Sequence, residues 1–115
     1  MAEADIGAHM SDLRALERAE AIIRRHAAQL GEHPRCAGVE VTRYPPPPRV
    51  SARPSIHLSA AFPDDGTEVK GVDHSGLADR VVAETGLEID PEYTGVFRWR
   101  RRNLIVYWWD WRAGA

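Results

Sequence analysis

The sequence predicts an α+β domain: a single, mainly antiparallel sheet of four strands with two helices packed on one face. Three observations lead to this fold class. Two segments place apolar residues at three- and four-residue spacing, which is typical of amphipathic helices. Four other segments alternate apolar with polar residues or are rich in β-branched and aromatic ones, which is typical of strands. The order along the chain is α-β-β-α-β-β.

The first helix is predicted to start at Ser11, whose side chain can cap it, and to end at Gly31, shortly before Pro34. On its polar side, Glu20 and Arg24 form an i,i+4 pair in the favoured order. Its apolar stripe consists of Leu13, Leu16, Ile22, Ile23, Ala27 and Leu30.

The first two strands are predicted at residues 36–44 and 53–62, where apolar and polar side chains alternate. Four prolines at 45–48 break the first strand, because proline cannot donate a ladder hydrogen bond. We expect them to form a stiff connector. The arginines on both sides of them also resemble a proline-rich docking motif. Residues 63–66, Pro-Asp-Asp-Gly, predict a turn after the second strand.

A second helix is predicted from Ser75, as its N-cap, to Gly86. The last two strands are predicted at residues 93–100 and 104–111. Residues 101–103 would join them in a three-residue loop, because Asn103 tolerates the left-handed conformation that closes such a loop. A two-residue turn stays open as an alternative, and the sequence does not fix the register.

This order equals a circular permutation of the ferredoxin-like β-α-β-β-α-β arrangement, in which the final strand would be central. Residues 104–109 are apolar on both faces, whereas a strand covered on one side should alternate. The second apolar face is therefore covered either by the first helix or by a partner. We expect a homodimer or a larger assembly.

The 115 residues fit a single domain, predicted at 11–115, which would bury roughly 65% of the unfolded surface. One cysteine, Cys36, excludes an internal disulfide framework and a Cys-based zinc cluster. No run of about 18 apolar residues exists, so we expect no membrane span. A net charge of −2 excludes a uniformly basic nucleic-acid binder.

Residues 1–10 are expected to be a poorly ordered tail, and residues 7–10, Gly-Ala-His-Met, resemble a cloning scar. Residues 1–6 are neither apolar nor basic, so we expect no signal peptide and a cytoplasmic location. Arginine provides all basic residues except Lys70, and alanine is abundant. Because their codons are GC-rich, we expect a bacterial genome of high GC content.

The charge is distributed unevenly. Residues 1–61 carry eight basic and seven acidic groups, residues 62–97 two and nine, and residues 98–115 five and one. The basic final segment also lies where most aromatic residues are, since seven of the nine fall between Tyr93 and Trp111. Such an asymmetry is evidence about partners.

The last hairpin is therefore the candidate partner-binding site. Tryptophan, tyrosine and arginine dominate protein interfaces, so we expect a small non-enzymatic protein that binds another protein or itself there. Alternatively, the arginines contact phosphates and the aromatics stack on bases of a nucleic acid. The predicted site residues are Arg98, Trp99, Arg100, Arg101, Arg102, Tyr107, Trp109 and Trp111.

A third hypothesis is a small enzyme or ligand-binding protein that uses His57 and His74. His33 and Cys36 have a metal-ligand spacing, but no second pair completes a site, so we expect no metal. No phosphate-binding loop or dinucleotide motif is present, so we expect no cofactor. The acidic stretch with Asp64, Asp65, Glu68, Asp73 and His74 is expected to bond its local backbone rather than to catalyse.

Overall fold

The computed structural model describes the backbone at residues 2–44, 54–66, 69 and 72–113. Within these ranges it describes all side chains except those at 2–12, 44, 74 and 75. The predicted proline connector at 45–48 and Glu68 lie outside the described residues.

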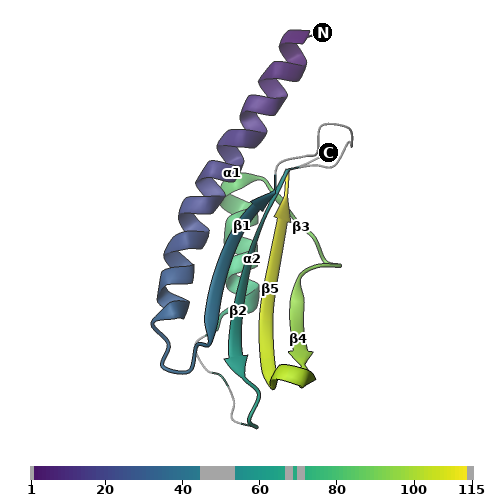
Figure 1. The fold of residues 1–115 in the computed structure, drawn as a ribbon. Coiled ribbons are helices and arrows are strands. Elements are labelled where there is room, and N and C mark those ends of the chain that lie inside the picture. Colours follow the sequence, from purple (N-terminus) through teal and green to yellow (C-terminus); the bar gives the residue numbers. More distant parts are fainter. Residues whose placement is uncertain (1, 45–53, 67–68, 70–71, 114–115) are drawn as a thin grey trace.

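One antiparallel sheet forms the centre of the fold (Figure 1). The strands are β1 (Gly38–Tyr44), β2 (Ser55–Pro63), β3 (Glu88–Ile89), β4 (Gly95–Trp99) and β5 (Leu104–Arg112). Because β2 pairs with the whole length of β5, the strands β3 and β4 both pair with the other side of β5. The order β1-β2-β5-β3 is that of the permuted ferredoxin-like arrangement, and the last strand is central, as predicted.

The sheet has five strands instead of the predicted four, because the strand expected at residues 93–100 is the second part of an interrupted edge. Pro91 lacks the N–H that a ladder needs, so the chain leaves the sheet after β3. The Asp90 N–H donates to the Asp110 carbonyl (2.8 Å). The Asp110 N–H donates to the Thr94 hydroxyl (2.9 Å), which replaces a missing backbone carbonyl.

Two helices, α1 (Ala2–Gly31) and α2 (His74–Thr85), pack on the same face of the sheet. Leu16 and Ile23 of α1 share one buried cluster with Val81 of α2 and with Leu58 and Trp109 of the sheet. The predicted stripe of α1 is confirmed, since Leu16, Ile23, Ala27 and Leu30 are buried.

Both helix starts differ from the predictions. Helix α1 begins at Ala2, so Ser11 lies inside it, and residues 2–10 are helical where a poorly ordered tail was expected. Alanine, the best helix former, supplies several of these residues. Helix α2 is capped by Asp73, not Ser75: its carboxylate accepts from the Gly76 N–H at 2.8 Å. Its end at Gly86, with a left-handed φ of 75°, is as predicted.

The face of the sheet opposite the helices is here called the open face. Every second side chain of each strand points toward it. Alternation places Trp109 and Trp111 of β5 toward the helices, where both are 0% exposed. Val106 and Trp108 therefore lie on the open face. The hypothesis that the first helix covers this second apolar face is wrong, because α1 packs on the same side as α2.

Candidate interaction surface

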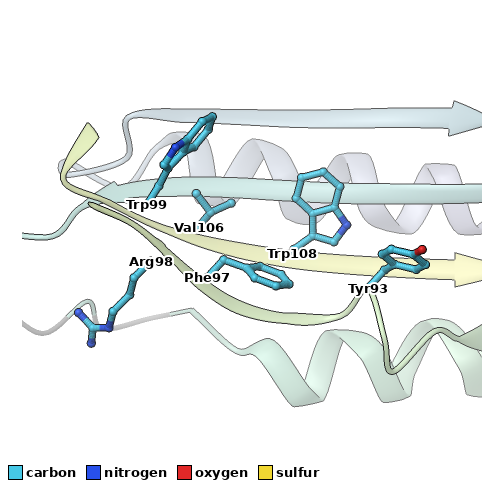
Figure 2. Close-up of a pocket in the computed structure, with 6 residues that line it drawn as sticks. All are labelled: Tyr93, Phe97, Arg98, Trp99, Val106 and Trp108. Atoms are coloured by element: carbon cyan, nitrogen blue, oxygen red, sulfur yellow. The ribbon is translucent and has the colours of Figure 1, made fainter. Parts of the chain in front are cut away.

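Antiparallel pairing of β4 with β5 gathers aromatic side chains on the open face. Phe97 and Trp99 of β4 lie opposite Val106 and Leu104 of β5, and Trp108 lies opposite Gly95. Because directly opposed residues share a face, these side chains all line the same surface. A hollow of about 360 Å³ lies among them (Figure 2). Its lining residues are Tyr93, Phe97, Arg98, Trp99, Val106 and Trp108.

Three of these aromatic side chains are half exposed. The exposed fraction is 50% for Tyr93 and 48% for both Phe97 and Trp99. Large apolar side chains scattered over a surface are ordinary, but neighbours around one hollow form a patch that water solvates poorly. We call the surface made by Tyr93, Phe97, Trp99, Val106 and Trp108 the aromatic patch.

Arg98 has a different role from the rest of the hairpin. It follows Phe97 on β4, so its side chain leaves the sheet on the other side, away from the aromatic rings (Figure 2). Its Nη1 donates to both carboxylate oxygens of Asp64, at 2.9 and 3.0 Å. The Asp64 N–H also donates to the Asn103 carbonyl (2.6 Å). Asp64 thus fastens the hairpin to the turn after β2.

The hairpin tip is a short 3-10 turn, Arg100–Arg102, closed by Asn103. Asn103 has the left-handed conformation that the sequence predicts (φ 51°, ψ 46°), although the loop between β4 and β5 has four residues instead of three. The guanidinium of Arg102 lies 4.3 Å from the centre of the Trp99 ring. All three arginines of the tip are exposed, so the aromatic patch ends in a basic tip.

The opposite end of the aromatic patch is polar and rich in carboxylates. Arg112 pairs with Asp90 (Nη2 to Oδ2, 3.0 Å) and with Asp110 (Nε to Oδ2, 3.2 Å). Its guanidinium also lies 5.3 Å from the centre of the Tyr93 ring. Glu88 lies opposite Arg112 on β3. Residues 88–92 carry three acidic and no basic side chains, which we call the acidic turn.

His57 lies under this polar end, buried against Trp108. It is 5% exposed, and Asp110, opposite it on β5, is 6% exposed. Burial lowers the pKa of His57, and the charges of Asp110 and Glu40 only partly offset this. Burial also raises the pKa of Asp110, against the hydrogen bond and charge of Arg112. A smaller hollow of about 200 Å³ lies over this pair.

The predicted site residues divide between two faces. Arg100, Arg101, Arg102 and Trp99 lie together at the tip, as expected of one surface. Trp109 and Trp111 belong to the core and are closed to any partner of the folded chain. Tyr107 also faces the helices, and its ring packs edge-on against Phe62 at 5.7 Å.

The predicted site residues leave out Tyr93, Phe97 and Trp108, which line the hollow on the open face. The signal that could have placed Trp108 is Asp110. A carboxylate belongs on the wetter face, and counting back by twos from it selects Trp108 and Val106. Because tryptophans occupy 108, 109 and 111, they fall on both faces and obscure this alternation.

The residues of the other hypotheses lie apart. His57 is on the open face, whereas His74 begins α2, on the opposite side of the sheet. Asp64 and Asp65 form ion pairs with Arg98 and Arg35, while Asp73 bonds the local backbone as expected. The described side chains contain no group of three or more metal-ligating residues.

No helix among the described residues is long and apolar enough to cross a membrane. Comparisons of this chain with protein-family models, curated proteins and solved structures find no match.

Proposed function

We propose that this chain is a small, non-enzymatic, cytoplasmic accessory protein of a bacterium that acts by binding protein through its C-terminal hairpin. The observation that carries the proposal is the aromatic patch, with Tyr93, Phe97 and Trp99 each about half exposed around one hollow. Half-exposed aromatic residues beside arginines have the composition of protein-interface hot spots. They stay uncovered although the fold buries a large apolar cluster on the helix side of the sheet.

The two ends of the aromatic patch specify the chemistry of a partner. The hollow accepts an apolar side chain, and Arg100–Arg102 pair with carboxylates beside it. The best ligand is therefore a protein segment with one or two large apolar residues and acidic neighbours.

The experiment uses a random peptide library displayed on phage and panned on the immobilised wild-type chain. A variant carrying Phe97→Ser and Trp108→Ser is the control, because both side chains line the hollow but neither is in the helix-side core. We expect acidic peptides with an aromatic or leucine residue to be enriched on the wild type alone. Equal enrichment on both proteins contradicts the proposal.

Binding of single-stranded nucleic acid is the second candidate, because aromatic rings on an open sheet surface are stacking platforms for bases. The charges favour it less. Phosphates need cations along the strand, but here they are concentrated at the tip, and the acidic turn lies at the other end.

Fluorescence anisotropy with labelled single-stranded DNA and RNA oligonucleotides, at low and high salt, separates the two candidates. The protein-binding proposal predicts no salt-dependent binding of the oligonucleotides. Binding that weakens steeply with salt, and that is lost when Arg100, Arg101 and Arg102 are replaced by alanine, would support the nucleic-acid candidate instead.

A further inference from the structure

Strand β4 is an uncovered edge of the sheet. It pairs with β5 on one side, and within the described part of the chain no strand pairs with its other side (Figure 1). Its side chains are exposed on both faces: Phe97 on the open face is 48% exposed, and Val96 on the helix side is 53% exposed. Arg98 is the one charged residue of β4, and it pairs with Asp64. An uncovered edge strand that is otherwise apolar is a template for pairing with another strand.

The other edge of the sheet, β1, has features that discourage pairing with another strand. The apolar side chains Val39 and Val41 pack against the helix-side core. Its exposed positions are charged: Glu40 accepts a hydrogen bond from Thr42, and Arg43 pairs with Glu20 of α1. Charged side chains of this kind discourage edge pairing. The two edges therefore differ, and β4 is the candidate for association.

The charges at the two ends of β4 indicate which partner strand it can bind. The acidic turn precedes the strand, and Arg100–Arg102 follow it. When two such strands run antiparallel, the basic tip of each copy lies toward the acidic turn of the other. When they run parallel, like charges meet at both ends. A second copy of this chain is therefore an electrostatic complement in one orientation only.

We propose that two copies of this chain pair edge to edge through β4, antiparallel and about a two-fold axis at Phe97. This pairing sets Phe97 opposite Phe97, Gly95 opposite Trp99 and Val96 opposite Arg98. It extends both sheets into one and joins the two aromatic patches into a single wider surface. The inference rests on the proposed function, because it names one protein partner of the same hairpin.

Cysteine cross-linking tests the register. Directly opposed residues of antiparallel strands have Cα atoms about 4.5–5.5 Å apart, within disulfide range. In a Cys36→Ser background, which removes the one native cysteine, the Phe97→Cys variant should form a disulfide-linked dimer under mild oxidation. Glu40→Cys, on the protected edge β1, is the matched control and should stay monomeric.

A mixture of two variants tests the register without replacing Phe97. In the same background, Val96→Cys and Arg98→Cys should cross-link to each other when mixed, and poorly when each is alone. Cross-linking of Val96→Cys with itself, or of Glu40→Cys more efficiently than Phe97→Cys, would overturn the inference.

A charge exchange tests the orientation. Analytical ultracentrifugation at about 0.1 mM protein should find the wild type partly dimeric, because a five-residue edge makes a small, weak interface. Glu92→Arg alone and Arg101→Glu alone should each weaken the dimer about five-fold, since each dimer contains two such contacts. The double variant should recover the wild-type affinity. A wild type that is monomeric at this concentration, or a double variant that is weaker than both single ones, contradicts the pairing.

The outcomes for the dimer and for the proposed function can be told apart. Peptide capture by the hollow, lost in the Phe97→Ser and Trp108→Ser variant, upholds protein binding even where the chain is monomeric. A dimer that cross-links at Phe97 while no peptide is captured upholds the edge pairing and overturns binding of other proteins through the open face.

Discussion

The imidazole of His57 stacks on the indole of Trp108 across strands β2 and β5, with ring centres 4.7 Å apart and ring planes at 28°. This contact joins a titratable side chain to the aromatic patch. It also explains why His57 is only 5% exposed although its side chain lies on the open face.

The burial of His57 and His26 makes stability depend on pH. Burial lowers the pKa of His57. Burial and the charge of Arg80 also lower the pKa of His26, and the charge of Asp73 offsets this lowering only partly. Below about pH 6.5 the unfolded chain therefore binds more protons than the folded one, and the free energy of unfolding falls as pH falls. We expect urea unfolding between about pH 7.5 and pH 5.5 to show this fall, with a shallower slope for His57→Gln. An unchanged slope in the variant would contradict this.

Asp110 has the opposite effect on the pH dependence of the free energy of unfolding. Burial raises its pKa, so the folded chain holds a proton at pH values where the unfolded chain has lost it. The stability that this proton contributes is lost as pH rises through the folded pKa of the carboxyl. We expect Asp110→Asn to remove this opposing contribution, so that its unfolding free energy falls more steeply than that of the wild type as pH is lowered. Chemical denaturation of both proteins at the same series of acidic pH values measures the difference. A shallower fall in the variant would show that Asp110 is not the group with the raised pKa.

The four tryptophans should differ sharply in their effect on stability. Trp109 is 0% exposed in the helix-side core, so Trp109→Ala should cost about 3–5 kcal/mol. Trp99 is 48% exposed, so Trp99→Ala should cost less than about 1 kcal/mol. Thermal and urea unfolding of both variants gives the comparison. Equal losses would mean that Trp109 on β5 and Trp99 on β4 are assigned to the wrong faces.

The contrast between these tryptophans shows what the sequence could and could not predict. The two helices, the antiparallel sheet and the central place of the last strand follow from periodicity and element order. The face to which each tryptophan belongs does not, because moving the pairing by one residue exchanges the faces. That register is set by pairing with β2, distant in sequence, which places Trp109 opposite Leu58.

Local signals predicted the C-terminal end of α2 correctly but not its N-terminal cap. Gly86 was recognisable because a left-handed residue ends many helices, and glycine adopts that conformation without strain. Ser75 and Asp73 are both good caps, and no local rule chooses between them. The structure chooses Asp73, whose carboxylate occupies the space that a Cβ at Gly76 would need.

The cap can be tested with the two competing residues. Asp73→Ala should lower the free energy of unfolding by about 1 kcal/mol, because the Gly76 N–H loses its acceptor. Ser75→Ala is the matched control and should change it by less than about 0.5 kcal/mol. Urea unfolding at neutral pH measures both. A larger loss for Ser75→Ala would restore the cap that the sequence first indicated.

The tip of the hairpin depends on one residue outside the usual backbone region. Asn103, at φ 51°, is the one non-glycine residue with a positive φ among those described, and its N–H donates to the Arg100 carbonyl at 3.3 Å. A β-branched side chain is strained there, so Asn103→Val should cost about 1–2 kcal/mol, whereas Asn103→Gly should be close to neutral. If the tip holds Arg100–Arg102 in place for a partner, Asn103→Val should also weaken peptide or dimer binding more than Asn103→Gly does. Urea unfolding and binding assays on Asn103→Val and Asn103→Gly measure both effects. Equal stability and equal affinity of the two variants would show that the left-handed conformation at Asn103 is not required.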